Sequence, residues 1–145
     1  MKVLQIQAKD TYLIRHKMLR AEYPMEDCHF EKDEDDQSFH LGAFMEGRLV
    51  SVASFYFEGH EKIEAPNQYR LRGMATLEEN QRKGLSSELL KAAFPIIKQN
   101  LCSVLWCNAR VSAIGFYQKV GFEIISETFD IPDVGPHVLM KKQVT

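Results

Sequence analysis

The stretch that decides the fold is residues 74–90, MATLEENQRKGLSSELL. It begins as an apolar strand, continues as a cationic loop, and becomes a helical apolar pattern near Ser86. The first amides of a helix have no intrahelical partner, and the helix dipole adds about half a positive charge there. Gly84 lets the backbone approach a ligand closely, and Arg82 and Lys83 add full charges. The spacing alone leaves two interpretations open, which are a phosphate or pyrophosphate site and a basic turn.

The loop matches neither of the two common phosphate-binding motifs. A Walker loop requires Gly-Lys followed by Ser or Thr, whereas here Lys83 precedes Gly84. The dinucleotide fingerprint requires three glycines, and this loop contains one. Nucleotide binding of either familiar kind is therefore not indicated.

Composition indicates an ordinary globular protein. With 145 residues, 45% hydrophobic and 26% charged, we expect one domain over residues 1–145. A net charge of −2 lacks the general basic field that non-specific nucleic-acid binding requires. No segment approaches the roughly 18 to 20 apolar residues of a membrane span, and the start, MKVLQIQAKD, lacks the apolar centre of a signal peptide. We therefore expect a cytoplasmic protein that binds neither nucleic acid nor membrane.

Three cysteines, Cys28, Cys102 and Cys107, argue against a disulfide framework because their number is odd. Zinc would need these thiols together with His29, but no CxxC pair is present. We therefore predict that Cys102 and Cys107, which lie on or beside an apolar run, are small buried side chains, and that there is no metal site.

Hydrophobic periodicity predicts the order β-α-β-β-β-α-β-α-β-β. The first helix should turn Leu13, Ile14, Met18 and Ala21 towards the core, and Pro95 should kink or shorten the second. A strand–helix–strand unit in the middle implies parallel pairing there, with antiparallel hairpins around it. Strands are expected at 3–6, 39–46, 49–58, 68–77, 103–109, 122–129 and 138–142, and helices at 11–22, from about 86, and at 113–120 with Gly121 behind it.

Residues 74–90 resemble the acyl-CoA loop of the GNAT superfamily of N-acetyltransferases, in which a strand, the pattern Gln/Arg-x-x-Gly-x-Gly/Ala and a helix follow one another. Here the pattern reads Gln81-Arg82-Lys83-Gly84-Leu85-Ser86, and Ser86, which could cap the helix or donate to phosphate, replaces the usual Gly or Ala. Residues 108–122, NARVSAIGFYQKVGF, resemble the later family segment with its aromatic-Tyr pair and closing Gly-Phe. The resemblance implies an α/β GNAT fold. Its mixed, mostly antiparallel sheet would have about six to seven strands flanked by helices, with a parallel strand pair at the CoA site.

The resemblance also implies an N-acetyltransferase that moves an acetyl group from acetyl-CoA to the primary amine of a small molecule or peptide by direct attack. The N–H of Met74 would hold the developing oxyanion. Tyr117 matches the tyrosine that protonates or orients the sulfur, for which an unperturbed pKa near 10 is suitable, although its apolar helical face also fits core packing. The implied CoA contacts are Met74, Ala75, Thr76, Arg82, Lys83, Gly84, Leu85, Ser86, Ser87, Asn108, Arg110 and Tyr117.

The general base is not evident, because the strand at 68–76 lacks the Glu that many family members use. His137 precedes the last predicted strand and histidine titrates near neutral pH, so it is the candidate base. His40, His60 and a water relay are the alternatives. Arg72 is unusual within a strand, and either binds a substrate carboxylate or makes a structural salt bridge.

The acceptor side should be lined by the hairpin loop and the segments 24–38 and 130–137. Arg72 favours an amino acid or a peptide terminus, whereas the acidic residues of these segments favour a cationic amine, namely Glu31 to Asp36, Asp130 and Asp133. The run 31–36 also fits a plain solvated loop. Two other functions stay open: a non-catalytic acyl-CoA-binding or sensing module on the same fold, and an interaction domain whose basic turn binds nothing. The resemblance also allows a homodimer.

Overall fold

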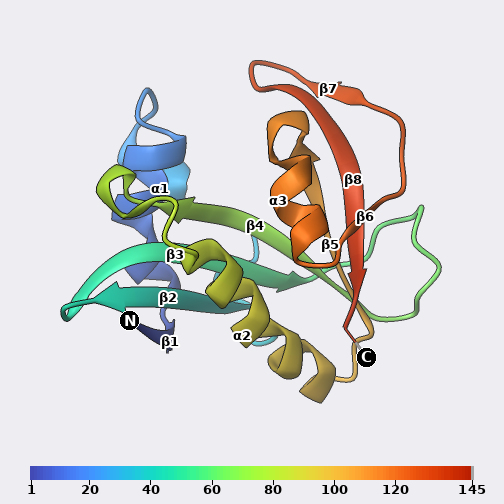
Figure 1. The fold of residues 1–145 in the computed structure, drawn as a ribbon, viewed down its shortest axis with the longest axis horizontal. Coiled ribbons are helices and arrows are strands. Elements are labelled where there is room, and N and C mark those ends of the chain that lie inside the picture. Colours follow the sequence, from blue (N-terminus) through green and yellow to red (C-terminus); the bar gives the residue numbers. More distant parts are fainter. Residues whose placement is uncertain (145) are drawn as a thin grey trace.

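The computed structural model describes residues 1–144, and the strands in that range form one sheet (Figure 1). Their order across the sheet is β1-β2-β3-β4-β5-β8-β6, and β7 pairs with the start of β8. The strands are β1 (Lys2–Ile6), β2 (Phe39–Met45), β3 (Arg48–Phe57), β4 (Gln68–Thr76), β5 (Val104–Arg110), β6 (Glu123–Ile124), β7 (Phe129–Ile131) and β8 (Gly135–Gln143). The helices are α1 (Tyr12–Leu19), α2 (Leu85–Gln99) and α3 (Ile114–Lys119).

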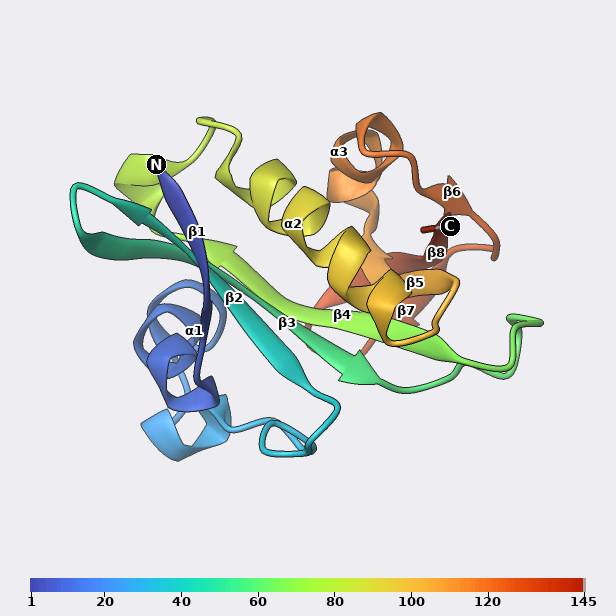
Figure 2. The ribbon, with the colours of Figure 1, turned by 90° about the horizontal axis from the view of Figure 1, so that it is seen from below.

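The sheet is mixed, as expected, with a parallel pair at β4 and β5 and antiparallel pairs elsewhere within the described residues. Helix α2 makes the crossover between the parallel strands. Figure 2 shows that α2 and α3 cover one face of the sheet, while α1 lies on the other. This arrangement confirms the predicted fold class and places the loop before α2 at the edge where β4 ends.

Helix α2 is amphipathic and continues through Pro95 to Gln99, so the shorter alternative is wrong. Its buried residues recur at intervals of about four and pack on the sheet, namely Leu85, Leu89, Leu90, Ala93 and Ile97. Pro95 lies on the exposed face, and so does Lys91, whose carbonyl the proline cannot bond. Water can therefore satisfy the carbonyl that the proline leaves free.

The first helix differs from the prediction for residues 11–22. A 3₁₀ turn at Ala8–Thr11 precedes α1, which ends at Leu19. Leu13 is 74% exposed, whereas Ile14 and Arg15 are buried. A pattern of apolar residues cannot identify a buried arginine. Because Leu13 is apolar, it was assigned to the inner face of the helix, and Arg15 was therefore assigned to the outside.

The acidic segment 31–36 is only in part the solvated loop that was one of its two interpretations. Glu31, Glu34, Asp35 and Asp36 are exposed. Asp33 is 6% exposed, and its carboxylate forms an ion pair with Arg15, 2.7 Å from Nη1. This ion pair holds the segment 31–36 against α1.

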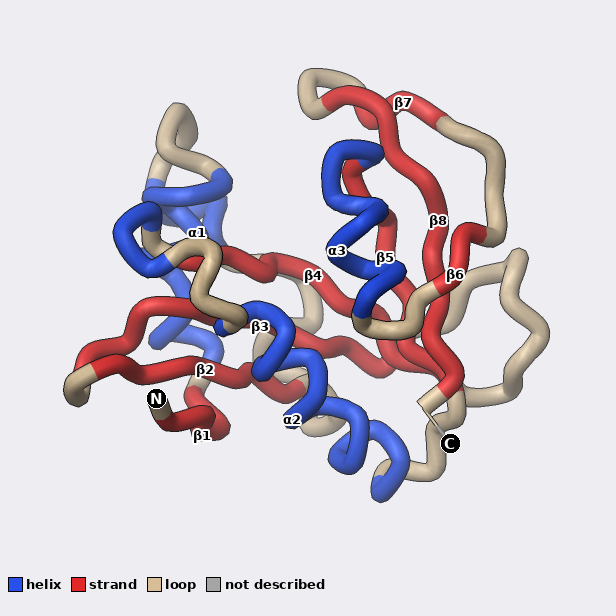
Figure 3. The backbone as a smooth tube through the Cα atoms, viewed as in Figure 1, coloured by secondary structure: helices blue, strands red, loops and turns tan. Residues whose placement is uncertain are grey.

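The C-terminal strands also differ from the prediction of 122–129 and 138–142. The first is divided into β6 and β7, which gives eight strands in place of six or seven, and the connection between them is a loop (Figure 3). Ser126 interrupts the ladder, because its Oγ accepts the Leu139 amide in place of a backbone carbonyl. Gly121 follows α3 with φ of 102°, which confirms its predicted left-handed conformation.

Burial of Cys102 and Cys107 is confirmed, and Cys28 is buried as well; all three cysteines are unbridged. In residues 1–144 no group of three or more His, Cys, Asp or Glu side chains is arranged to hold a metal ion. No helix in the same range has the length and apolar character needed to cross a membrane.

Candidate active site

A β-bulge shapes the middle of β4. The pairing register with β3 shifts at Ala53, which faces two residues, Gly73 and Met74. Gly73 has φ of 63°, and a Cβ there would lie 3.0 Å from the Phe30 ring and 3.2 Å from Arg15 Nε. Only glycine fits both the conformation and the space. Because a bulge leaves a residue out of the ladder, the Met74 segment is where β4 can offer a backbone N–H to a ligand.

Strands β4 and β5 separate ahead of the bulge (Figure 1). Their parallel pairing covers three residue pairs and ends at Arg70 and Trp106. From Leu71 to Thr76, β4 has no strand partner on its β5 side among the described residues. This open edge leads to a cavity of about 660 Å³, the loop cavity, at the start of α2. Eight of the predicted CoA residues line it: Met74, Ala75, Thr76, Arg82, Gly84, Leu85, Ser86 and Ser87.

The loop before α2 contains two residues in the left-handed conformation. Gly84 is the N-cap residue with φ of 78°, and Arg82 is also left-handed, with φ of 63°. The first helical bond runs from the Glu88 amide to the Gly84 carbonyl, so the intervening amides have no helical partner. Lys83 is exposed and is not among the residues that line the loop cavity.

Ser86 acts differently from the capping role considered for it. The start of α2 has no side-chain cap, and the Ser86 Oγ lies 3.3 Å from the Thr76 hydroxyl. Thr76 in turn hydrogen-bonds the Ser51 hydroxyl at 2.6 Å. This chain of hydroxyls links the first turn of α2 to β4 and β3, so that the small side chain helps to hold the two walls of the loop cavity together.

A second cavity of about 340 Å³, the central cavity, adjoins the first. The two share five lining residues, namely Leu19, Met74, Ser86, Ala113 and Phe116. The central cavity brings together the three predicted catalytic residues, Met74, Tyr117 and His137, from β4, α3 and β8. Asn108 and Arg110 line it as well, and neither lines the loop cavity.

Tyr117 is 9% exposed and sits between the rings of Phe116 and Phe122, with its hydroxyl against the Cys107 thiol. Burial, followed by the neighbouring thiol, raises the pKa of Tyr117 well above 10.0. The expectation of an unperturbed tyrosine is therefore wrong, because the side chain belongs both to the core and to the wall of the central cavity.

His137 is 4% exposed, and its Nδ1 lies 2.8 Å from the Gly135 carbonyl. A carbonyl can only accept, so Nδ1 carries the proton and Nε2 keeps its lone pair. Nε2 makes no hydrogen bond within the described residues. The other histidines lie elsewhere: His40 is buried between Ser54 and the Asp33 carbonyl, and His60 packs against Trp106.

Comparison with known proteins agrees with this geometry. A sequence profile described as the acetyltransferase (GNAT) family matches residues 3–122. The uncharacterized N-acetyltransferase YitI of Bacillus subtilis is 40% identical over 142 residues, which cover 98% of this chain and 95% of that protein. The chain belongs to the GNAT family of acetyltransferases.

Solved structures with GNAT activities share the fold at low sequence identity. An aminoglycoside 6'-N-acetyltransferase complexed with coenzyme A has a TM-score of 0.79 and 10% identity, with 100% of this chain and 98% of that chain covered. The ribosomal-protein-S18-alanine N-acetyltransferase from Escherichia coli has a TM-score of 0.76 and 16% identity, with 99% and 94% covered. This acetyltransferase therefore has the architecture of enzymes whose acceptors differ widely.

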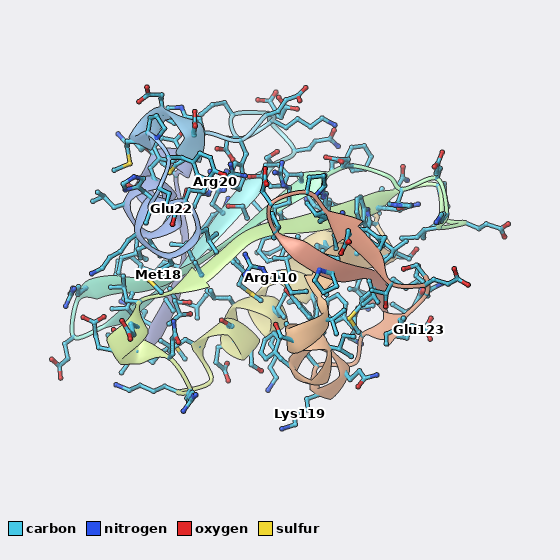
Figure 4. All side chains as sticks on the ribbon, turned by 90° about the horizontal axis from the view of Figure 1, so that it is seen from above. Met18, Arg20, Glu22, Arg110, Lys119 and Glu123 are labelled. Carbon is cyan, nitrogen blue, oxygen red and sulfur yellow. The ribbon has the colours of Figure 1, made fainter. Side chains whose placement is uncertain are left out.

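A third cavity of about 690 Å³, the arginine cavity, adjoins the central cavity. Arg72, Gly73, Asn108, Arg110 and His137 line both. Its other walls come from the end of α1 and from the turn between β7 and β8. In Figure 4, Arg110 lies in the opening between α1, marked by Met18, and the β7–β8 hairpin. The three cavities together form one trough from the α2 loop to this opening.

Several residues of the trough were not predicted. Met18 and Leu19 line the loop cavity from α1, and Ser112 lines it from the turn before α3. Arg20 lines the arginine cavity, whereas Phe30, which also lines it, belongs to the segment 24–38 expected on the acceptor side. The residues at and after the end of α1 were counted as core or ignored because the predicted helix was longer. Only the packing of α1 across β4 brings these side chains to the trough.

Proposed function

We propose that this acetyltransferase moves an acetyl group from acetyl-CoA to the primary amine of a small molecule or peptide by direct attack. One observation carries the proposal: the continuous trough joins the predicted CoA residues at the α2 loop to Met74, Tyr117 and His137 at its centre. The donor and the acceptor can then enter from opposite ends and meet at the bulge of β4. The proposal treats residues 1–145 as one catalytic domain.

The loop cavity suits the donor. The free amides of Leu85, Ser86 and Ser87, with the positive end of the α2 dipole and Arg82, favour a pyrophosphate. The unpaired edge of β4 can hydrogen-bond an extended amide-containing arm in the place of a strand. The Met74 N–H at the bulge is then the donor for the carbonyl oxygen, which gains negative charge as the amine attacks.

Tyr117 is proposed to hydrogen-bond the sulfur of the leaving group. Because burial raises its pKa, the hydroxyl stays protonated and gives up its proton less readily than a free tyrosine. A thiol has a pKa near 8.5, so complete proton transfer to the thiolate would be unfavourable, whereas a hydrogen bond is not. Tyr117 therefore stabilises and orients the thiolate as the C–S bond breaks.

His137 is proposed as the general base. The Gly135 carbonyl holds the Nδ1–H, and Nε2 is left to take a proton from the incoming ammonium group. The neutral amine then forms the N–C bond and the C–S bond breaks. The leaving thiolate takes the second proton of the attacking nitrogen, so that the N-acetylated amine and a free thiol are released. His137 lines both the central cavity and the arginine cavity, so an amine that enters through either cavity can reach it.

Two measurements test the proposal. Calorimetry with acetyl-CoA should show binding, and its absence at millimolar ligand would exclude a CoA-dependent function. A panel of primary amines with acetyl-CoA, followed by release of free thiol, should reveal turnover. Binding of acetyl-CoA without thiol release above the hydrolysis background for any amine would instead support a non-catalytic acyl-CoA-binding module.

A further inference from the structure

The arginine cavity is strongly cationic within. Four arginines line it: Arg20, which follows the end of α1, Arg70 and Arg72 on β4, and Arg110 on β5. Its carboxylates are Glu22 and Asp133, and both are exposed at its margin. The acidic segment expected to attract a cationic amine does not reach it, because Asp33 is buried against Arg15 and the next acids line a separate hollow beside Phe57.

Arg70 and Arg72 lie two residues apart on β4, but their partners differ. Arg70 Nη1 pairs with Glu58 at 2.9 Å, and its guanidinium lies over the Trp106 ring at 4.9 Å. Among the described residues, no carboxylate lies within ion-pair distance of Arg72. The structural salt bridge that was one explanation for a strand arginine is therefore absent from the described part of the chain.

Arg72 is held by an aromatic ring instead. Its guanidinium lies over Phe30 at 4.4 Å, and Arg20 lies over the same ring at 5.2 Å. Stacking fixes the plane of a guanidinium but leaves its N–H groups free to donate. Burial, and then the charge of Arg70, lower the pKa of Arg72. Arg72 is thus a half-buried positive charge with no carboxylate within ion-pair distance among the described residues.

Arg72 lies next to the residues that we propose to carry out acetyl transfer. Arg72 directly precedes the bulge at Gly73 and Met74, and it lines the same two cavities as His137. An anion bound there lies beside the point where the amine is deprotonated. A planar guanidinium suits a carboxylate or a phosphate, which it can bind through two parallel N–H groups.

We propose that the arginine cavity binds an anionic group of the acceptor, so that the substrate is an amine that also carries a carboxylate or a phosphate. Arg72 is the principal contact, and Arg20 and Arg110 add positive charge. This inference rests on the proposed function and narrows it to amino-acid-like or aminophosphate acceptors. A polyamine or another purely cationic amine is disfavoured, since it would bring further positive charge into the cavity.

The test compares pairs of acceptors in which one member carries an anionic group and the other does not. L-phenylalanine is paired with L-phenylalaninamide, and phosphoethanolamine with ethanolamine, with kcat/KM corrected for the fraction of neutral amine in each probe. A charge-assisted hydrogen bond typically corresponds to about a tenfold to hundredfold preference. We expect at least about a tenfold advantage for the anionic member of one pair, and the favoured pair distinguishes carboxylate from phosphate.

The variant Arg72→Gln should abolish this preference: the ratio of kcat/KM for the anionic substrate to that for its neutral partner should fall by about tenfold or more. Lys119→Gln is the matched control, because it removes an equal charge from the exposed end of α3, outside the three cavities. It should keep the preference of the wild type. Thermal unfolding of both variants checks that each is folded.

The outcomes separate this inference from the proposed function. If neutral or cationic amines are acetylated as well as the acids, the anion site is wrong and acetyl transfer stands. If no amine is acetylated, calorimetry with N-acetyl-L-phenylalanine, its carboxamide and inorganic phosphate decides the matter. Binding of an anion that Arg72→Gln removes supports the site without any turnover, and equal binding or no binding of the probes overturns it.

Discussion

Replacing Asp33 by Asn should destabilise the protein strongly, because Asp33 balances a buried arginine. The two side chains are 4% and 0% exposed. The carboxylate accepts from Arg15 Nη1 at 2.7 Å, Arg15 Nη2 at 3.0 Å and the Phe30 amide at 2.9 Å, and also from the Tyr56 hydroxyl. Asparagine keeps the shape but removes the charge, and it turns an N–H₂ group towards these donors.

The expected loss is about 3 to 5 kcal/mol, the cost of removing one partner of a buried ion pair. For a chain of this length that corresponds to a fall in Tm of about 10 to 16 °C. Asp35→Asn is the matched control, since Asp35 lies two residues away and is exposed. It should change Tm by about 2 °C or less. Thermal and urea unfolding followed by circular dichroism measure both variants.

The pH dependence follows from the same pair. Burial alone would raise the pKa of Asp33, but the bonds from Arg15, Tyr56 and the Phe30 amide outweigh it and lower the pKa below 3.8. Its stabilising contribution is therefore complete above the unfolded pKa of about 4 and is lost as the pH falls through the lower folded value. The difference in stability between wild type and Asp33→Asn should be constant at neutral pH and should narrow below about pH 4. A loss under about 1 kcal/mol, or one equal to that of Asp35→Asn, would refute the reasoning.

Three substitutions in the trough test its proposed chemistry. Gly73→Ala should lower the free energy of unfolding by about 1 to 3 kcal/mol and kcat by more than tenfold, because the added Cβ would collide with Phe30. Gly115→Ala is the control: its Cβ meets no atom within 4 Å, so both the stability and kcat should stay near the wild-type values. Tyr117→Phe should lower kcat by about ten- to a hundredfold with Tm nearly unchanged, and an unaltered kcat in steady-state kinetics would remove the proposed contact with sulfur. His137→Gln should lower kcat by about 10² to 10⁴, whereas His60→Gln, which lies outside the three cavities, should preserve kcat. An unchanged kcat for His137→Gln would point to a water relay.

Local sequence was sufficient to predict the loop before α2, at the end of the trough where we propose that acetyl-CoA binds. The features that make the α2 loop are a glycine in a left-handed conformation, a helix that begins behind it and two adjacent cations, and each is encoded within a few residues. The hairpin of β2 and β3 and the turn at Gly121 were found for the same reason. Gly73 carried a comparable signal, since a glycine inside a strand pattern indicates a bulge.

The arrangement of the arginine cavity, at the other end of the trough, is determined by tertiary structure. Arg15 and Asp33 lie 18 positions apart, and both were hidden because sequence patterns assign charged residues to the surface. The charge of Arg72 was visible in the sequence, but its lack of a carboxylate partner among the described residues was not. In the fold, Glu58 pairs with Arg70, and the Phe30 ring from another segment packs against Arg72. Tyr117 was recognised from its motif, yet its raised pKa comes from burial that only packing creates. Conformational preferences are local and can be read from the sequence, whereas the partner of a charge is set by which segments the fold brings together.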